Sequence, residues 1–165
     1  MHKNLLEKLM FELAKNSKRS DRELAKILGV SQPTITRART RLEKENFIRH
    51  YTVFPDFAKI GFELIALNFA TLKPSQSSDP EKMKKMRSEW AKGNPNVVLE
   101  ISGEGLGANS LMISIHRNYT EFASFIAKYR TNLADCLQDL KSFIVSTPNK
   151  NLIVKDLSFN DLGKM

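Results

Sequence analysis

The stretch SDRELAKILGVSQPTITRARTRL, residues 20–42, decides the fold of the N-terminal third of the chain. Ser20 is followed three residues later by Glu23, which is the spacing of a capping box at a helix start. Gly29 can adopt the left-handed conformation that ends this helix, while Ser31 can cap a second helix whose first turn tolerates Pro33. The stretch therefore predicts two short helices joined by a tight turn.

Apolar residues at helical spacing predict how these helices pack. The predicted buried face of the first helix consists of Leu24, Ile27 and Leu28, and that of the second consists of Ile35, Ala38 and Leu42. Residues 3–16 have the same apolar spacing and should form a preceding helix that packs on both. We expect a three-helix domain over residues 1–50.

The other side of the second helix is cationic and rich in hydroxyl groups. A helix that presents Arg and Thr and is held by a preceding helix across a short turn can place base-reading side chains in a DNA major groove. The alternative is an ordinary solvent-exposed helix of an all-α bundle. The candidate DNA-binding residues are Ser31, Gln32, Thr34, Thr36, Arg37, Thr40, Arg41 and Lys44. Arg37 is the first choice for a guanine or a phosphate, and Lys44 for a phosphate.

The charge distribution favours the same interpretation. The chain has 165 residues and a net charge of +8. Residues 1–50 carry 12 Lys and Arg against 6 Asp and Glu, and residues 51–165 carry 14 against 12. The excess positive charge therefore lies beside the two-helix motif, as expected if that region neutralises DNA phosphates.

Other classes of protein are disfavoured by composition. The apolar runs are short, no basic face adjoins a bulky apolar one, and the N-terminus lacks a secretory signal, so we expect a cytoplasmic protein without membrane contact. Cys136 is the only cysteine, which excludes an intrachain disulfide and a multi-cysteine metal site, and it should be a small buried helix residue. We predict no metal, cofactor or catalytic residues.

The rest of the chain predicts an α+β domain in the order βαββαβ. Residues 49–54 should form a short strand or wing that leaves the helical domain and leads into a connecting strand or hinge, residues 51–61, that Gly61 closes. The predicted domain, residues 62–165, has strands at 62–72, 96–102, 110–116, 143–147 and 152–157, with the last a possible half-strand. Its helices should start near Asp79–Pro80 and at Asn118.

Right-handed crossovers fold this order into one ferredoxin-like antiparallel sheet with both helices on one face. The opposite face would be left uncovered although the strands supply apolar residues to both sides. A second copy of the chain could cover it, so we predict a homodimer through this domain.

These segments resemble the Lrp/AsnC family of transcriptional regulators in order and spacing. The resemblance rests on ELAKILGVS at 23–31, TITR at 34–37, RLE at 41–43, FIRHYT at 47–52 and DFAKIG at 56–61, and covers nearly the whole chain. It implies a winged helix-turn-helix domain followed by a βαββαβ (RAM-type) effector domain. It further implies dimers that often assemble into octamers, bind double-stranded DNA, and take a small-molecule effector, commonly an amino acid.

The chain departs from the family pattern at three places. Arg39 replaces an aliphatic residue at the edge of the buried helix face, where it should snorkel or pair with an acid. Ala38 replaces a frequent arginine. The loop SGEGLGAN at 102–109 is longer than the family's and lacks its Asp, for which Asn109 is the substitute.

This loop defines the candidate effector-binding residues Gly103, Gly105, Gly107 and Asn109. Its glycine spacing is not a dinucleotide fingerprint, because a strand and not a helix follows it. We expect a flexible hairpin loop.

Two alternatives to an effector-modulated regulator stay open. One is an enzyme resembling the sirohaem decarboxylases, for which His116 and Arg117 would be the available groups in the C-terminal half. The other is a DNA-binding protein that binds no effector and uses the second domain only to assemble.

Overall fold

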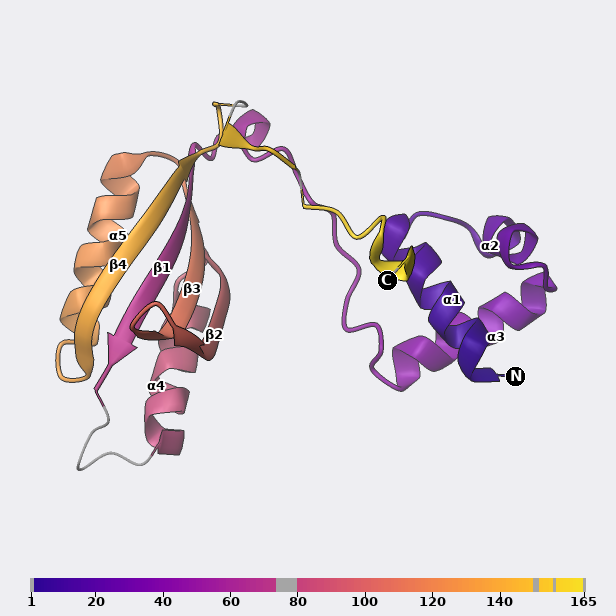
Figure 1. Cartoon of the computed structure of the whole chain (residues 1–165), viewed down its shortest axis with the longest axis horizontal. Coiled ribbons are helices and arrows are strands. Elements are labelled where there is room, and N and C mark those ends of the chain that lie inside the picture. Colours follow the sequence, from indigo (N-terminus) through magenta and orange to yellow (C-terminus); the bar gives the residue numbers. More distant parts are fainter. Residues whose placement is uncertain (1, 74–79, 150–151, 156, 165) are drawn as a thin grey trace. The chain divides into compact units, whose positions relative to one another are not determined.

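The computed structural model describes all residues except 1, 74–79, 150–151, 156 and 165. The chain divides into two compact units (Figure 1). The N-terminal unit comprises residues 1–54 together with 155–165, and the sheet unit comprises residues 55–154. The expected division placed residues 155–165 with the second domain, whereas their contacts group them with the first.

The N-terminal unit is built from α1 (His2–Lys15), α2 (Asp21–Leu28) and α3 (Gln32–Lys44). The predicted capping box is present at α2: Ser20 Oγ accepts a bond from the Glu23 amide at 3.3 Å, and Glu23 Oε2 accepts one from the Ser20 amide at 2.7 Å. Gly29 ends α2 with φ of 68°, and Ser31 caps α3. Each predicted boundary signal of the two-helix motif is thus used as expected.

One core joins the three helices. Its buried residues are Leu9, Leu13, Leu24, Ala25, Ile35, Ala38 and Leu42. Each fully buried leucine or isoleucine contributes about 1.5–3 kcal/mol relative to an exposed one. The prediction for Ile27 was wrong, because its side chain is 50% exposed and Ala25 occupies the core instead.

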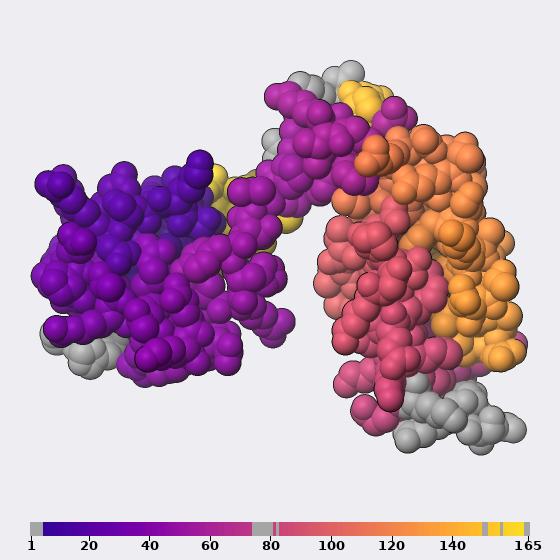
Figure 2. Space-filling view, turned by 180° about the vertical axis from the view of Figure 1, so that it is seen from behind, coloured from indigo at the N-terminus to yellow at the C-terminus, as the bar shows by residue number. Residues whose placement is uncertain are grey.

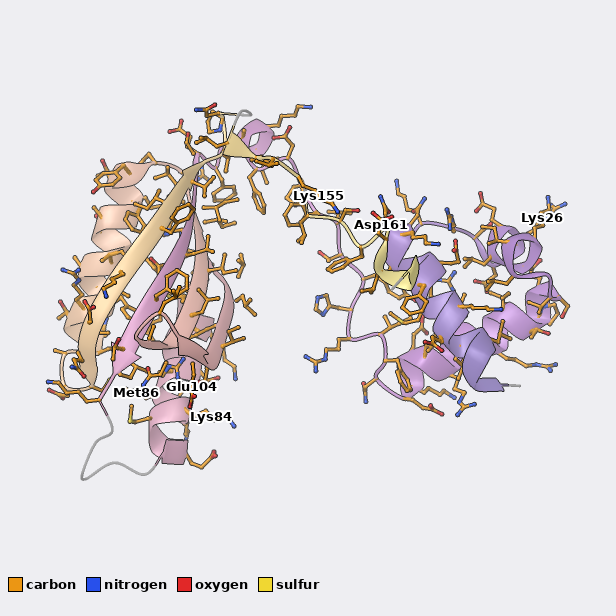
Figure 3. All side chains as sticks on the ribbon, in the orientation of Figure 1. Lys26, Lys84, Met86, Glu104, Lys155 and Asp161 are labelled. Carbon is orange, nitrogen blue, oxygen red and sulfur yellow. The ribbon has the colours of Figure 1, made fainter. Side chains whose placement is uncertain are left out.

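The tail of the chain belongs to this unit. The short helix η3 (Leu162–Lys164) contacts α1, and Lys155 and Asp161 mark the segment that leads to it (Figure 3). Gly163 lies so close to Phe11 of α1 that an added Cβ would be 3.1 Å from the Phe11 Cβ. The absence of a side chain at residue 163 therefore permits this packing.

The sheet unit has the predicted βαββαβ order: β1 (Leu64–Leu72), α4 (Pro80–Gly93), β2 (Val97–Gly105), β3 (Ala108–His116), α5 (Tyr119–Asn132) and β4 (Leu137–Ser146). The spatial order is β2-β3-β1-β4, and every neighbouring pair is antiparallel. The predicted α+β, ferredoxin-like class is confirmed. Asp79, the predicted cap of α4, lies outside the described residues.

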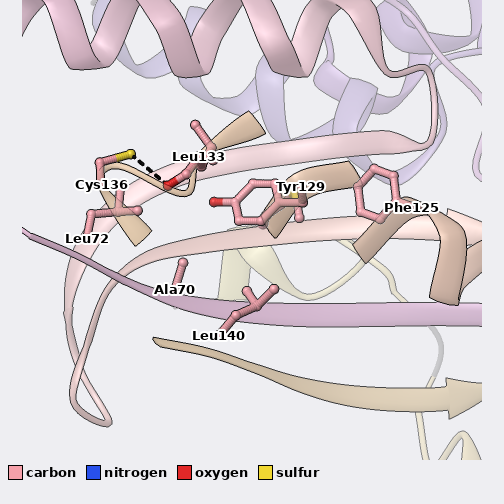
Figure 4. Packing of buried hydrophobic residues seen from close by; sticks show 8 residues of the cluster. Ala70, Leu72, Phe125, Tyr129, Leu133, Cys136 and Leu140 are labelled. Carbon is pink, nitrogen blue, oxygen red and sulfur yellow. Dashed lines mark hydrogen bonds between the residues drawn. The ribbon is translucent and has the colours of Figure 1, made fainter. Parts of the chain in front are cut away.

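Both helices cover the same sheet face. Phe125 and Tyr129 of α5 pack in one cluster with Ala70 of β1 (Figure 4). Trp90 of α4 packs against the same cluster, and its ring centroid lies 4.8 Å from that of Tyr129. The colours of α4 and α5, pink and orange, dominate the surface of this unit in Figure 2. Cys136 is buried as predicted, but in the turn after α5 and not on a helix, where its thiol donates to the Leu133 carbonyl at 3.4 Å.

Three strand predictions were wrong in extent. The last strand runs from Leu137 to Ser146, and the described part of 152–157 forms no strand. The reason is that β1, which pairs with the last strand, begins at Leu64 opposite Ser146, and beyond this pair the ladder extends only to the bond from the Thr147 amide to the Glu63 carbonyl. Residues 51–56 likewise lack strand structure and lead to the short helix η1 (Ala58–Ile60).

The third difference is the loop between β2 and β3. The strands continue to Gly105 and from Ala108, leaving only Leu106 and Gly107 between them. Both have positive φ, 54° and 71°, as a tight two-residue hairpin turn requires. The expected long, flexible loop is therefore an extended hairpin.

The uncovered face of the sheet is apolar. Phe143 is 64% exposed, Ile101 45% and Leu99 42%. The register places Leu67 between Phe143 and Ile113, and Ile113 beside Leu99, so the apolar residues run across all four strands. Isolated exposed apolar side chains are ordinary, but a continuous sheet face of them indicates an interaction surface.

Candidate nucleic-acid interface

The exposed side of α3 carries cations available to a ligand. Arg37 and Lys44 are both exposed, and neither forms an ion pair with any residue that the structure describes. Gln32 is exposed at the start of the same helix. These three side chains stay candidates for DNA contact, since none of them has to leave an ion pair with a described residue before it can bind a ligand.

The predicted hydroxyl groups are partly engaged inside the motif. Thr36 Oγ1 donates to Asp21 Oδ2 at 2.7 Å, and Thr40 Oγ1 donates to the Thr36 carbonyl at 2.9 Å. Ser31 Oγ and Thr34 Oγ1 are bonded to each other at 2.8 Å. Because the protons of Thr36 and Thr40 are donated inward, those oxygens can accept bonds from base amino groups, and their methyl groups can contact thymine.

Arg41 is held only weakly. Its Nε donates to Glu45 Oε1 at 2.7 Å, and the two side chains are 51% and 44% exposed. Such surface pairs contribute about 0–1 kcal/mol, so a phosphate can replace Glu45 at little cost.

Arg39 serves a different role, as its sequence position indicated. It pairs with Asp21 at 2.8 Å, and the two side chains are only 18% and 20% exposed. The same guanidinium donates to the Arg19 carbonyl at 3.1 Å. The prediction that Arg39 pairs with an acid is confirmed, and the pair fixes α3 against the start of α2.

The candidate effector residues shape the β2–β3 hairpin and do not line the cleft between α4 and β2. Asn109 Oδ1 accepts a bond from the Leu72 amide at 2.9 Å, and its Nδ2 donates to the Leu72 carbonyl, also at 2.9 Å. The side chain thereby fastens the hairpin to the end of β1. Gly105 and Gly107 have positive φ and shape the turn, and Gly103 lies on β2.

A cleft with a volume of about 490 Å³ lies between α4 and β2. Arg87 stands in its wall and donates to Glu100 Oε1 at 2.8 Å and to Ser110 Oγ at 2.6 Å. Sequence reasoning did not identify this pair, because Arg87 and Glu100 come together only through the packing of α4 on the sheet.

His116 is a core residue. Its side chain is fully buried, its Nε2 lies 2.9 Å from Ser114 Oγ, and its ring packs edge-on against Phe122. Asn68 Nδ2 donates to the same Ser114 Oγ at 3.0 Å, so the histidine belongs to an internal polar chain. Burial lowers the pKa of His116, although the nearby Glu121 carboxylate opposes this, and the ring stays neutral near pH 7.

The described part of the chain offers neither a metal site nor a membrane-spanning helix. It contains no cluster of three or more His, Cys, Asp or Glu side chains that could hold a metal ion. It also contains no helix with the length and apolar character needed to cross a bilayer.

Comparison with known proteins agrees with the geometry of α2 and α3. Residues 4–49 match a family model described as winged helix-turn-helix DNA-binding. The chain is 30% identical over 96 residues to PH0061, an uncharacterized HTH-type transcriptional regulator of Pyrococcus horikoshii. That match covers 54% of this chain and spans 64% of the length of the relative.

Solved structures extend the likeness to both units. The crystal structure of PH0061 gives a TM-score of 0.75 at 22% identity, covering 93% of this chain and 95% of that one. An AsnC family regulator from Agrobacterium tumefaciens gives 0.72 at 20%, covering 86% and 88%. A transcriptional regulator from Neisseria meningitidis, in complex with L-Met, gives 0.76 at 17%, covering 96% and 97%.

The fold and the matched model define a protein with an N-terminal winged helix-turn-helix DNA-binding domain and a C-terminal four-stranded antiparallel domain. Its sequence relative is named as an HTH-type transcriptional regulator. The chain has the two-domain fold of a solved AsnC family regulator, as the resemblance recognised in the sequence implied for the fold.

Proposed function

We propose that this chain is a sequence-specific, homodimeric DNA-binding transcriptional regulator of the Lrp/AsnC type that acts in the cytoplasm. The observation that carries the proposal is the face of α3, where Arg37 and Lys44 are exposed without an ion pair to any described residue. The Arg39–Asp21 pair holds this helix against the start of α2, which limits the entropy lost when it enters a groove.

The side chains of α3 divide between base and backbone contacts. Arg37 is suited to a guanine edge or a phosphate, and Lys44, at the last turn of the helix, to a phosphate. Arg41 can also contact a phosphate once its ion pair with Glu45 is broken. Ser31, Gln32 and Thr34 at the start of α3, with Thr36 and Thr40 along it, complete the contact surface.

The uncovered sheet face is the surface for dimerisation. Pairing with a second copy would bury Leu99, Ile101 and Phe143, which are all more than 40% exposed. Two copies could then present two α3 helices about 34 Å apart, the spacing of one turn of DNA, to a near-palindromic site. Further assembly to octamers follows the family pattern.

The proposal also includes a small-molecule effector that binds in the sheet unit. The similar regulator from Neisseria meningitidis is described in complex with L-Met. In this chain the Asn109 amide is already bonded to Leu72, so an effector at this hairpin would have to use backbone groups near Gly103, Gly105 and Gly107. A regulator that binds no effector is the competing version.

The structure does not favour the sirohaem-decarboxylase alternative, because His116, the histidine that it would use, is buried. His116 is fully buried and bonded to Ser114, so it does not face the cleft between α4 and β2. A buried histidine cannot exchange protons with a bound tetrapyrrole without local unfolding.

The test is selection of bound fragments from the genome that encodes the chain, followed by retardation assays at several salt concentrations. Selective, salt-sensitive binding of recurring fragments is expected. Equal binding of all duplexes, or none, would refute sequence-specific regulation. A thermal-shift screen with the twenty amino acids tests the effector, since a ligand at 100 times its Kd stabilises the fold by about 2.7 kcal/mol.

A further inference from the structure

Residue Tyr51 bridges the connector and α3. Its hydroxyl donates to Glu43 Oε1 at 2.8 Å and accepts a bond from Arg39 Nη1 at 3.4 Å. Arg39 and Glu43 are four residues apart on α3 and so lie on one side of the helix. Burial raises the pKa of the Tyr51 hydroxyl, Arg39 lowers it, and the bond to Glu43 raises it, so the group keeps its proton near pH 7.

The bonds continue from Tyr51 to the predicted DNA face. Arg39 Nε donates to Asp21 Oδ1 at 2.8 Å, and the other oxygen of that carboxylate accepts the Thr36 hydroxyl at 2.7 Å. Thr36 is a predicted DNA-contacting residue. A continuous path of hydrogen bonds therefore leads from the connector through Arg39 and Asp21 to the surface of α3.

We propose that Tyr51 is a positioning residue for DNA binding, acting as a clasp that determines which acid Arg39 pairs with. The inference rests on the proposed function. While the Tyr51 hydroxyl is hydrogen-bonded to Glu43, Arg39 keeps its ion pair with Asp21. Asp21 in turn holds the Thr36 side chain in place by a hydrogen bond. When the hydroxyl is withdrawn, Glu43 lies within reach of Arg39 and competes with Asp21 for it.

The location of Tyr51 gives this clasp a regulatory use. The sheet unit starts at Pro55, four residues beyond Tyr51 along the chain. A change in the sheet unit that pulls on the connector would withdraw the hydroxyl and disturb Thr36 without any direct contact with α3. The Arg39 guanidinium can pair with Asp21 or with Glu43, and these two pairings are the two alternative states that such coupling requires.

The test compares Tyr51→Phe with Tyr119→Phe in the full chain. Tyr119 is 65% exposed on α5 and supplies a matched loss of one hydroxyl far from α3 in sequence. The probes are a genomic fragment selected by the parent protein and a scrambled fragment of equal length. For Tyr51→Phe we expect affinity for the selected fragment to fall about 2- to 10-fold, the effect of one lost hydrogen bond. Tyr119→Phe, and both variants on scrambled DNA, should stay within about 2-fold of the parent.

A rescue experiment distinguishes positioning from simple destabilisation. If Glu43 draws Arg39 away in Tyr51→Phe, then removing its charge restores the Asp21 pair. The double variant Tyr51→Phe/Glu43→Gln should therefore bind the selected fragment as tightly as Glu43→Gln alone, within about 2-fold. Failure of this rescue, or equal affinities of the Tyr51→Phe and Tyr119→Phe variants for the selected fragment, would overturn the proposal that Tyr51 positions Arg39. If the parent shows no selective binding, the proposed function itself fails, which is a distinguishable result.

Discussion

Replacing Arg37 by alanine should weaken binding to the selected DNA while leaving the fold intact. The side chain is exposed on α3 and forms no ion pair with the described residues, so its loss should change the free energy of unfolding by less than about 0.5 kcal/mol. A bidentate contact to guanine is worth about 1–3 kcal/mol, which corresponds to a loss of affinity of about 5- to 150-fold.

The assay is a competition between selected and scrambled fragments, repeated at several salt concentrations. If Arg37 contacts a base, selectivity should fall, whereas a phosphate contact should lower affinity for both fragments and reduce the salt slope by about 0.9. Lys128→Ala is the matched control, because Lys128 is an exposed cation on α5 of the sheet unit. Equal binding by Arg37→Ala and Lys128→Ala would refute the assignment of α3 as the recognition helix.

Three further predictions concern the fold and the assembly. Burial lowers the pKa of His116 in the folded chain, so below about pH 6.5 the unfolded chain binds a proton at this histidine more readily than the folded chain does. Thermal stability should therefore fall as the pH drops below about 6.5. His116→Gln should flatten this decline; an unchanged profile would contradict the explanation. Gly163→Val should speed proteolysis of the tail by displacing it from Phe11, whereas Gly93→Val, which meets nothing within 4 Å, should not. Phe143→Glu should convert dimers to monomers in analytical ultracentrifugation, and Val154→Glu, at a residue that is 98% exposed, should leave them intact. Persistent dimers in Phe143→Glu would exclude the sheet face.

Much of the fold could be predicted because its signals are local. The capping box at Ser20 and the turn at Gly29 involve groups only a few residues apart, and the structure uses both as predicted. The partner of Arg39 was predicted only as an unspecified acid. Asp21 is 18 residues away in sequence, and the packing of α3 on α2 brings the two together.

The errors in strand extent share one cause, which is that a strand needs a neighbour. Residues 152–157 have strand-forming side chains, but β1 begins only at Leu64, opposite Ser146, and offers them no partner. Conversely, β4 starts at Leu137, ahead of two polar residues, because β1 continues beside it. The glycines of the β2–β3 hairpin lie in strand because β3 continues beside β2. Propensity does not reveal the length of the adjacent strand.

By itself the amino-acid sequence determined the order of the elements, the two-helix motif and the cationic side of α3, since these depend on periodicity and on contacts within one or two turns. Only the tertiary structure decided that Asn109 bonds to Leu72, that Arg87 meets Glu100, that η3 packs against α1, and that Tyr51 lies between Arg39 and Glu43. Each of these contacts joins segments brought together by chain packing, whose geometry no local pattern encodes.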